Sequence, residues 1–408
     1  MTEKSAKPQL RFAGFDDTWE QRKVGELLIE RNEQAPMSEE YPLMAFIANE
    51  GVAPKGERYD RSSLVTDTEN KLYKRTEFGD FIYSSNNLET GSIGLNKYGK
   101  ACISPVYSIF QSTGIADSDF LGRRLVRKDF INSMVKWRQG VIYGQWRIHE
   151  SDFLKIEIPV PSVEEQKQIG TFLDYLDNLI TLHQRKYDKL TNVKKSMLEK
   201  MFPKNGSNVP EIRFKGFSDA WEQRKALDIA DYSKGNGYSK SDLTEIGTPI
   251  ILYGRLYTKY QFAIDEVDTF ATPKDGSVYS QGNEVIIPAS GETAEDIARA
   301  SAVEKSGILL GGDLNILRPF NFVNPLFLAL TISNGQPQKE LAKKAQGKSV
   351  VHIHNSDIQE VSVSFPTRAE QDRIVAVFRN LDNLITLHQR ELEKLKNLKK
   401  ACLEKMFV

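Results

Sequence analysis

Hydrophobic residues recur at intervals of three and four positions in two segments, residues 165–202 and residues 370–407. This period predicts an amphipathic helix in each segment. Ser162 and Thr367 precede the two segments, and a glutamate follows each of them three residues later, which predicts a capping box at both helix starts. At 1.5 Å per residue, each helix would be about 57 Å long.

The apolar residues of each predicted helix form a heptad-like stripe that a histidine interrupts. Such a stripe needs an apolar partner, so we expect the two helices to pack together as an antiparallel coiled coil. We interpret His183 and His388 as a polar pair that fixes helix register, and the alternative is contact with a partner subunit. The stripes consist of Leu176, Leu179, Ile180, His183, Tyr187, Leu190, Val193, Met197 and Met201, and of Leu381, Leu384, Ile385, His388, Leu392, Leu395, Leu398, Cys402 and Met406.

The two helical segments belong to an internal duplication, the strongest pattern in the chain. They agree at 23 of 38 positions with an offset of 205. Residues 11–23 (RFAGFDDTWEQRK) agree with residues 213–225 (RFKGFSDAWEQRK) at ten of thirteen positions with an offset of 202. Between the repeated segments, residues 28–158 and 230–363 show no useful alignment, and we call these stretches the variable segments.

Short runs rich in Ile, Val, Tyr and Phe, separated by Gly, Pro and Asn, predict strands in both variable segments. The sequence therefore predicts a mixed α/β (α+β) fold. Two globular domains are joined by two long antiparallel coiled-coil helices, with an internal pseudo-twofold repeat. The predicted boundaries are 1–158 for the first domain, 159–203 for the central helix, 204–365 for the second domain and 366–408 for the C-terminal helix.

Composition narrows the class of protein. With 408 residues, 40% hydrophobic and 27% charged, the chain suits a folded protein of two or three domains. No apolar run approaches the roughly 18 residues that span a bilayer, and the first ten residues lack a signal-peptide core, so we expect a cytoplasmic location without membrane contact. The 55 basic and 55 acidic residues balance, which removes the basic excess typical of nucleic-acid binding. Cys102 and Cys402 form no metal or disulfide pattern, and we expect no cofactor.

Catalytic motifs are incomplete. Residues 324–327 (NPLF) and 104–107 (SPVY) are similar to the Pro-Pro-aromatic loop of DNA adenine methyltransferases, but both lack the second proline. No glycine-rich turn offers a site for the methyl donor, and residues 347–349 (GKS) lack the earlier glycine of a phosphate loop. We interpret the chain as non-catalytic. A self-contained methyltransferase and a protein-only coiled-coil scaffold remain as alternatives.

DNA contacts are the remaining candidate chemistry. Lysine and arginine bind phosphates, while Arg, Asn, Gln and Ser can bond base edges. Gly-rich loops that bear such residues occur in both variable segments. The candidate residues are Lys55, Arg58, Arg61, Asn86, Asn87, Asn96, Lys97, Lys100, Arg138, Gln145 and Arg147 in the first half, and Lys234, Asn236, Tyr238, Lys240, Arg255, Tyr257, Lys259, Ser290, Thr293, Lys343, Lys344, Gln346, Lys348 and Ser349 in the second.

The repeated arrangement resembles one family over essentially the whole chain: the specificity subunits of type I restriction–modification systems, especially those of Gram-positive bacteria. The WEQRK openings at 19–23 and 221–225, the P-x-x-x-E-Q segments at 161–166 and 366–371, and the decamer LDNLITLHQR in both helices carry the resemblance.

This resemblance implies two target-recognition domains, each of which reads one half of a bipartite, asymmetric double-stranded DNA site. It implies that the paired helices act as a spacer and dock two methyltransferase subunits, and that a restriction (translocase) subunit joins the complex. Because the net charge is zero, we expect weak DNA binding by the isolated chain and tight binding only in the complex.

Overall fold

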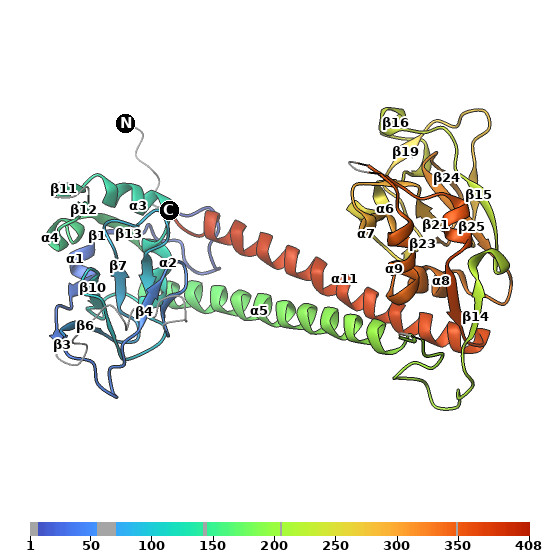
Figure 1. Cartoon of the computed structure of the whole chain (residues 1–408). Coiled ribbons are helices and arrows are strands. Elements are labelled where there is room, and N and C mark those ends of the chain that lie inside the picture. The colour runs from blue at the N-terminus through green and yellow to red at the C-terminus, as the bar shows by residue number, and fades with distance from the viewer. Residues whose placement is uncertain (1–6, 55–70, 142–144, 205, 348–349) are drawn as a thin grey trace. The chain divides into compact units, whose positions relative to one another are not determined.

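The computed structural model describes residues 7–54, 71–141, 145–204, 206–347 and 350–408. Internal contacts divide the chain into two units, Met1–Leu182 with Glu391–Val408, and His183–Arg390. Two long helices, α5 (Val163–Lys200) and α11 (Arg368–Lys405), each contribute one part to each unit (Figure 1). A unit therefore consists of one globule, the beginning of one long helix and the end of the other.

The globule of the first unit is built from short antiparallel strands. Its four-stranded sheet has the order β2-β10-β7-β8, and a three-stranded sheet has the order β3-β6-β9. The strands are β1 (Glu20–Lys23), β2 (Leu28–Glu30), β3 (Gln34–Ala35), β4 (Ala45–Ile47), β5 (Gly51–Ala53), β6 (Tyr73–Thr76), β7 (Phe81–Tyr83), β8 (Ile93–Leu95), β9 (Ala101–Ile103), β10 (Ser108–Ser112), β11 (Gln139–Val141), β12 (Gln145–Arg147) and β13 (Glu157–Val160). The helices are α1 (Val24–Leu27), α2 (Ser118–Leu125), α3 (Lys128–Val135) and α4 (Glu150–Phe153).

The globule of the second unit contains two five-stranded sheets, with orders β15-β25-β21-β23-β18 and β16-β19-β17-β24-β20. Its strands are β14 (Glu222–Lys225), β15 (Ala230–Lys234), β16 (Leu243–Thr244), β17 (Thr248–Ile251), β18 (Ala263–Ile264), β19 (Phe270–Ala271), β20 (Tyr279–Gln281), β21 (Glu284–Pro288), β22 (Ser290–Gly291), β23 (Ser301–Val303), β24 (Ser306–Leu310), β25 (Leu314–Pro319), β26 (Val351–His352) and β27 (Ser362–Phe365). Its helices are α6 (Arg255–Thr258), α7 (Ala294–Ile297), α8 (Pro325–Ile332), α9 (Gly335–Lys344), α10 (Asn355–Gln359) and the 3-10 turns η4 (Ala226–Asp228) and η5 (Lys240–Asp242).

The predicted class is confirmed: two mixed α/β globules accompany a pair of 38-residue helices. The globules differ in sheet order, which agrees with the lack of alignment between the variable segments. In the second unit the long helices are antiparallel, because Lys194 pairs with Asp382 while His183 lies beside His388. The four-part domain division stays a prediction, since contacts assign each helix to both units.

Both units share a set of equivalent contacts, which we call the duplicated framework. Its first part is a two-stranded antiparallel ribbon, β1 with β13 in the first unit and β14 with β27 in the second. The residue after each opening strand donates its N–H to the segment before the closing strand: Val24 to Ile156 O at 2.8 Å, and Ala226 to Val361 O at 2.9 Å. The repeated sequence EQRK thus brings the start of each globule next to its exit into the long helix.

The second part of the framework is a buried ion pair at the start of each long helix. Arg11 Nε and Nη2 donate to Glu165 at 2.8 and 2.7 Å, and Arg213 makes the same fork with Glu370 at 2.9 and 2.8 Å. The predicted capping boxes are therefore wrong in part. Glu165 N does donate to Ser162 Oγ at 3.3 Å, but both glutamate side chains turn to the arginines instead of back to the cap. The fork satisfies a carboxylate that is almost fully buried.

The third part is an aromatic contact with the end of the other long helix. Trp19 packs against Phe120 and Phe407, with ring centroids 5.7 and 6.4 Å apart. In the second unit, Trp221 packs in the same way against Phe327 and Phe202, at 5.6 and 5.9 Å.

Backbone hydrogen bonds tie the same helix ends. Leu10 N donates to Lys405 O, and Ile212 N donates to Lys200 O, each at 2.9 Å. Each opening segment therefore holds the end of the helix that the other repeat begins.

The NPLF motif belongs to this framework. Asn324 is the N-cap of α8, where its Oδ1 accepts from Leu326 N at 2.9 Å, and Pro325 takes the first helical position. Phe327 is buried against Trp221. In the first unit, Asp117 caps α2 in the same manner and positions Phe120. The motif that is similar to a methyltransferase loop is thus a helix start in the core.

We predict that Arg213→Ala lowers the free energy of unfolding by about 3 kcal/mol, because it leaves Glu370, only 1% exposed, as a buried charge without its partner. Urea unfolding followed by circular dichroism measures this change. The matched control is Glu222→Ala, which removes the exposed pair with Arg224 from its other side and should cost less than about 1 kcal/mol. Equal effects of the two substitutions would contradict the role given to the buried pair.

Candidate nucleic-acid interface

Several predicted contact residues lie outside the described part of the chain: Lys55, Arg58, Arg61, Lys348 and Ser349. Gln145 belongs to β12, but its side chain is not among those described. The structure positions the remaining candidates, in four groups.

In the first unit, two predicted loops that are distant in sequence lie side by side. Asn86 Oδ1 accepts from Trp146 N at 2.6 Å, and Ser85 Oγ accepts from Ile148 N at 3.0 Å. Arg138 Nε donates to Ser85 O at 3.1 Å. These bonds join the loop after β7, which also carries exposed Asn87, to the β11–β12 ribbon, which carries exposed Arg147. The structure therefore gathers four of the predicted residues in one place.

The two arginines of this group differ in their surroundings. Arg138 forks onto Glu89 with both bonds at 2.7 Å and is largely buried, and this contact lowers the pKa of the Glu89 carboxyl. Arg147 is exposed, and its guanidinium lies 3.7 Å from Glu150. Arg138 thus fixes the position of the ribbon, whereas Arg147 extends from it and can reach a phosphate.

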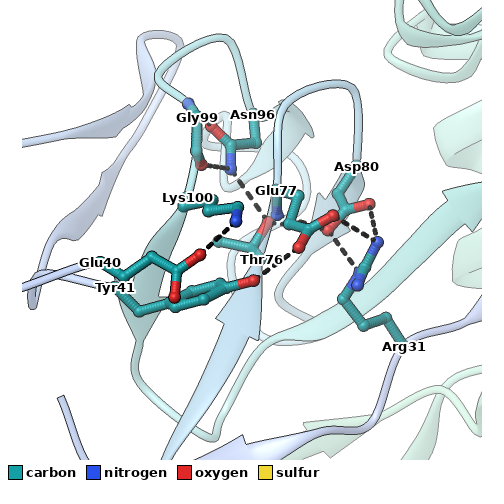
Figure 2. Close-up of polar contacts among 9 residues, drawn as sticks. All are labelled: Arg31, Glu40, Tyr41, Thr76, Glu77, Asp80, Asn96, Gly99 and Lys100. Carbon is teal, nitrogen blue, oxygen red and sulfur yellow. Dashed lines mark hydrogen bonds and ion pairs between the residues drawn. The ribbon is translucent and has the colours of Figure 1, made fainter. Parts of the chain in front are cut away.

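The second group surrounds the loop between β8 and β9, shown in Figure 2. Asn96 is fully buried: its Oδ1 accepts from Tyr98 N and Gly99 N, and its Nδ2 donates to Gly99 O at 2.7 Å and Thr76 Oγ1 at 3.1 Å. The turn needs Gly99, whose φ is 126°. A contact between Asn96 and a base, as the sequence predicted, is inconsistent with this burial, because the whole amide is used to shape its own loop.

Both lysines of the same loop pair with acidic side chains, and Figure 2 shows this for Lys100. Lys100 pairs with Glu40 and lies over the ring of Tyr41, 5.5 Å from its centre. Tyr41 donates to Glu77 at 2.6 Å, and this bond lowers the pKa of the Glu77 carboxyl. Lys97 pairs with Asp119 at 3.0 Å. These pairs offset the positive charge that would attract phosphates.

Buried acid–base contacts hold the neighbouring turn between β6 and β7. Arg31 Nε lies 2.9 Å from Asp80, whose Oδ2 also accepts from Glu77 N at 2.7 Å (Figure 2). Burial raises the pKa of the Asp80 carboxyl in spite of these contacts. The network has the properties of a structural support for two adjacent turns.

In the second unit, the third group follows β15. Tyr238 is buried, and its hydroxyl lies 2.5 Å from Ser277 Oγ and accepts from Lys274 N at 2.8 Å. Asn236 Nδ2 donates to Gly276 O at 2.7 Å. These two residues hold one loop to another, and exposed Lys234 and Lys240 flank them.

The fourth group lies around α6, β22 and β26. Ser290 Oγ lies 3.1 Å from His352 Nδ1, and the backbone of His352 also pairs with Gln346. Among the remaining members, Thr293 caps α7, the ring of Tyr257 lies near that of Tyr253, and Lys343 is exposed. Lys344 pairs with Glu360. Arg255 and Lys259 both bind Asp268 and lower the pKa of its carboxyl.

The long helices expose apolar residues at equivalent positions of the two repeats. Leu182 and Leu387, which occupy equivalent positions, are 45% and 52% exposed. Val193 and Leu398, which are also equivalent to each other, are exposed as well. The predicted stripes are therefore wrong at Val193, Leu398 and Leu384, which face solvent. Each helix carries more apolar surface than its packing partners cover.

The two helix histidines face each other, with Nδ1 atoms 3.1 Å apart. Burial, His183 and Lys186 lower the pKa of His388. The register role stays a prediction.

In the described part of the chain, no helix combines the length and the apolar character needed to cross a membrane.

Comparison with known proteins gives a consistent match. The family described as Type I restriction modification DNA specificity domain matches residues 16–192 and 218–397. Each match contains one variable segment and most of the long helix that follows it. The family unit therefore occurs twice, as the duplication predicts.

Individual relatives match along most of the chain. The Type I restriction enzyme MjaVIII specificity subunit of Methanocaldococcus jannaschii is 23% identical over 410 residues, which cover 94% of this chain and 91% of the relative. A crystal structure of a type I restriction–modification system S subunit from M. genitalium matches with a TM-score of 0.56 and 14% identity, and covers 98% of this chain and 99% of that chain. At this identity the structural likeness shows a shared fold.

Proposed function

We propose that this chain reads a bipartite, asymmetric double-stranded DNA site. The chain belongs to the type I restriction–modification DNA specificity family and is a non-catalytic specificity subunit. The observation that carries the proposal is the combination of one duplicated framework with two unlike globules. Equivalent frameworks would present the globules in equivalent ways. Because the globules differ in sheet order and in loops, each would read a different half-site.

The candidate DNA contacts of this proposal are the exposed polar residues of the loops described above. In the first unit these are Asn86, Asn87 and Arg147, next to the ribbon that Arg138 fixes. In the second unit they include exposed Lys234, Asn236, Lys240, Lys343 and Gln346. Many other basic side chains pair with acids, so we expect weak DNA binding by the isolated chain and tight binding in the complex.

We further propose that the helices dock two methyltransferase subunits and that restriction subunits complete the complex. Support comes from the exposed leucines at equivalent positions of the two repeats, since a duplicated apolar surface suits two copies of one partner. Such a complex would work on DNA in the cytoplasm. The Gram-positive type stays a proposal from the sequence, because the relative from Methanocaldococcus jannaschii is archaeal.

A segment exchange tests the DNA-reading proposal. Genomic N6-methyladenine is mapped in cells that express this chain with its cognate methyltransferase subunit, before and after residues 28–158 are replaced by those of another family member. We expect a split, asymmetric motif with a fixed gap, of which the exchange alters one half only. A protein-only scaffold would give no motif that depends on this chain, and a change in both halves would contradict separate reading by the two globules.

Leu182→Glu and Leu387→Glu test the docking surface. Burial of each leucine against a partner would stabilise the proposed contact by about 1.5–3 kcal/mol. Each substitution removes this stabilisation and places a charge in the contact, so each should remove one methyltransferase copy. Mass photometry of the reconstituted complex should show two copies on the wild type, one on each single variant and none on the double variant. The control is Ile246→Glu, an exposed site on the second globule. Two copies retained by both single variants would place the docking surface elsewhere.

A further inference from the structure

The β11–β12 ribbon of the first unit forms a two-stranded sheet of its own. Gln139 pairs with Arg147, and Gly140 pairs with Trp146. An isolated ribbon is marginal in water, so its anchors matter. Three contacts described above hold its base: Asn86 with Trp146 N, Ser85 with Ile148 N, and the Arg138–Glu89 fork. The contacts therefore hold the ribbon at the residues next to the start of β11 and at the end of β12, while the described residues on both of its faces are exposed.

Trp146 projects from one face of this ribbon. Opposite residues of an antiparallel pair share a face, and the partner of Trp146 is Gly140, which has no side chain. A Cβ atom built on Gly140 would lie 4.0 Å from Trp146 Cζ3, so the indole lies across the glycine. The side chain remains 49% exposed. One function of the ring is to cover Gly140, and that contact uses only part of the ring surface.

The other tryptophans of the chain have different surroundings. Trp19 and Trp221 are buried in the duplicated framework. Trp137 is 40% exposed, but it lies beside the ribbon rather than on it, and Lys155 Nζ lies 5.9 Å above its ring. Trp146 therefore combines a half-exposed aromatic surface with a position on an anchored ribbon that belongs to no larger sheet.

We propose that Trp146 is a specificity-determining residue of the first globule and contacts a base of its half-site through the exposed part of the indole. This inference rests on the proposed function. The major groove of B-form DNA admits a two-stranded β-ribbon, and apolar side chains there discriminate thymine by its methyl group. The indole would make this contact, and Arg147, on the opposite face of the ribbon, would bind the adjacent phosphates.

The preorganised anchors favour this assignment. A flexible aromatic side chain loses entropy on binding, whereas an indole fixed on Gly140 and on a ribbon held by Asn86 and Arg138 is already ordered. The loss of the contact with one base pair of a specific duplex site weakens binding about tenfold or more. Because the second globule does not use this ribbon, the effect should be confined to one half of the motif.

The test uses the full chain in complex with its cognate methyltransferase. Trp146→Ala should weaken binding to the cognate duplex about tenfold or more and relax the N6-methyladenine motif only in the half that the exchange of residues 28–158 alters. Trp146→Phe should retain most of the affinity, and Trp137→Ala, the matched control, should retain both affinity and motif. If Trp146→Ala matches Trp137→Ala while the wild type still gives a split motif, the assignment is wrong and the proposed function stands. If the wild type gives no motif, both fail.

Fluorescence gives a second readout that does not depend on the folding of an alanine variant. In the isolated chain with Trp137→Phe, Trp146 is the one tryptophan that is not buried, so it should dominate the response of the emission to DNA once the duplex is concentrated enough to saturate the weak binding of this chain. We expect the cognate duplex to quench or shift this emission and a duplex substituted in the corresponding half-site to do so less. Emission unchanged by saturating cognate duplex would overturn the proposal.

Discussion

The buried fork between an arginine of the opening segment and a glutamate in the first turn of the long helix is the contact on which the rest of each unit depends. Arg11–Glu165 and Arg213–Glu370 join residues more than 150 positions apart. A carboxylate that is nearly removed from water must be paired, so the opening segment has one favourable position relative to the helix start. The two-stranded ribbon of each framework and the tryptophan that follows the arginine are thereby placed as well.

The tryptophan then connects this start to the end of the other helix. Trp19 contacts Phe407, and Trp221 contacts Phe202, so each unit contains the beginning of one long helix and the end of the other. Apart from Phe120 and Phe327, which pack against the two tryptophans, most of each variable segment lies outside these contacts, between the two strands of each framework ribbon. This arrangement lets a globule change its loops without changing the way it meets the helices, which is the property that a sequence-reading subunit needs.

The sequence predicted the long helices well because their period is regular: residues 165–202 and 370–407 were expected, and Val163–Lys200 and Arg368–Lys405 are observed. It did not predict that the side chains of Glu165 and Glu370 bind an arginine instead of the backbone of the cap residue, because that arginine is distant in the sequence. It also failed at Asn96, because composition marks a polar loop residue but does not show that the loop folds around that side chain. Apolar residues such as Leu398 fit the heptad stripe, yet burial depends on the partner helix, which a single period does not specify.

Hydrogen–deuterium exchange of the complete methyltransferase complex, with and without its cognate duplex, tests the central claim most directly. The account predicts added protection in one set of loops per unit, around residues 84–91 in the first and 234–240 in the second. The framework strands β1, β13, β14 and β27 should exchange as before, because they hold the globules and do not touch DNA. Protection confined to one unit, or to α5 and α11 alone, would contradict the account.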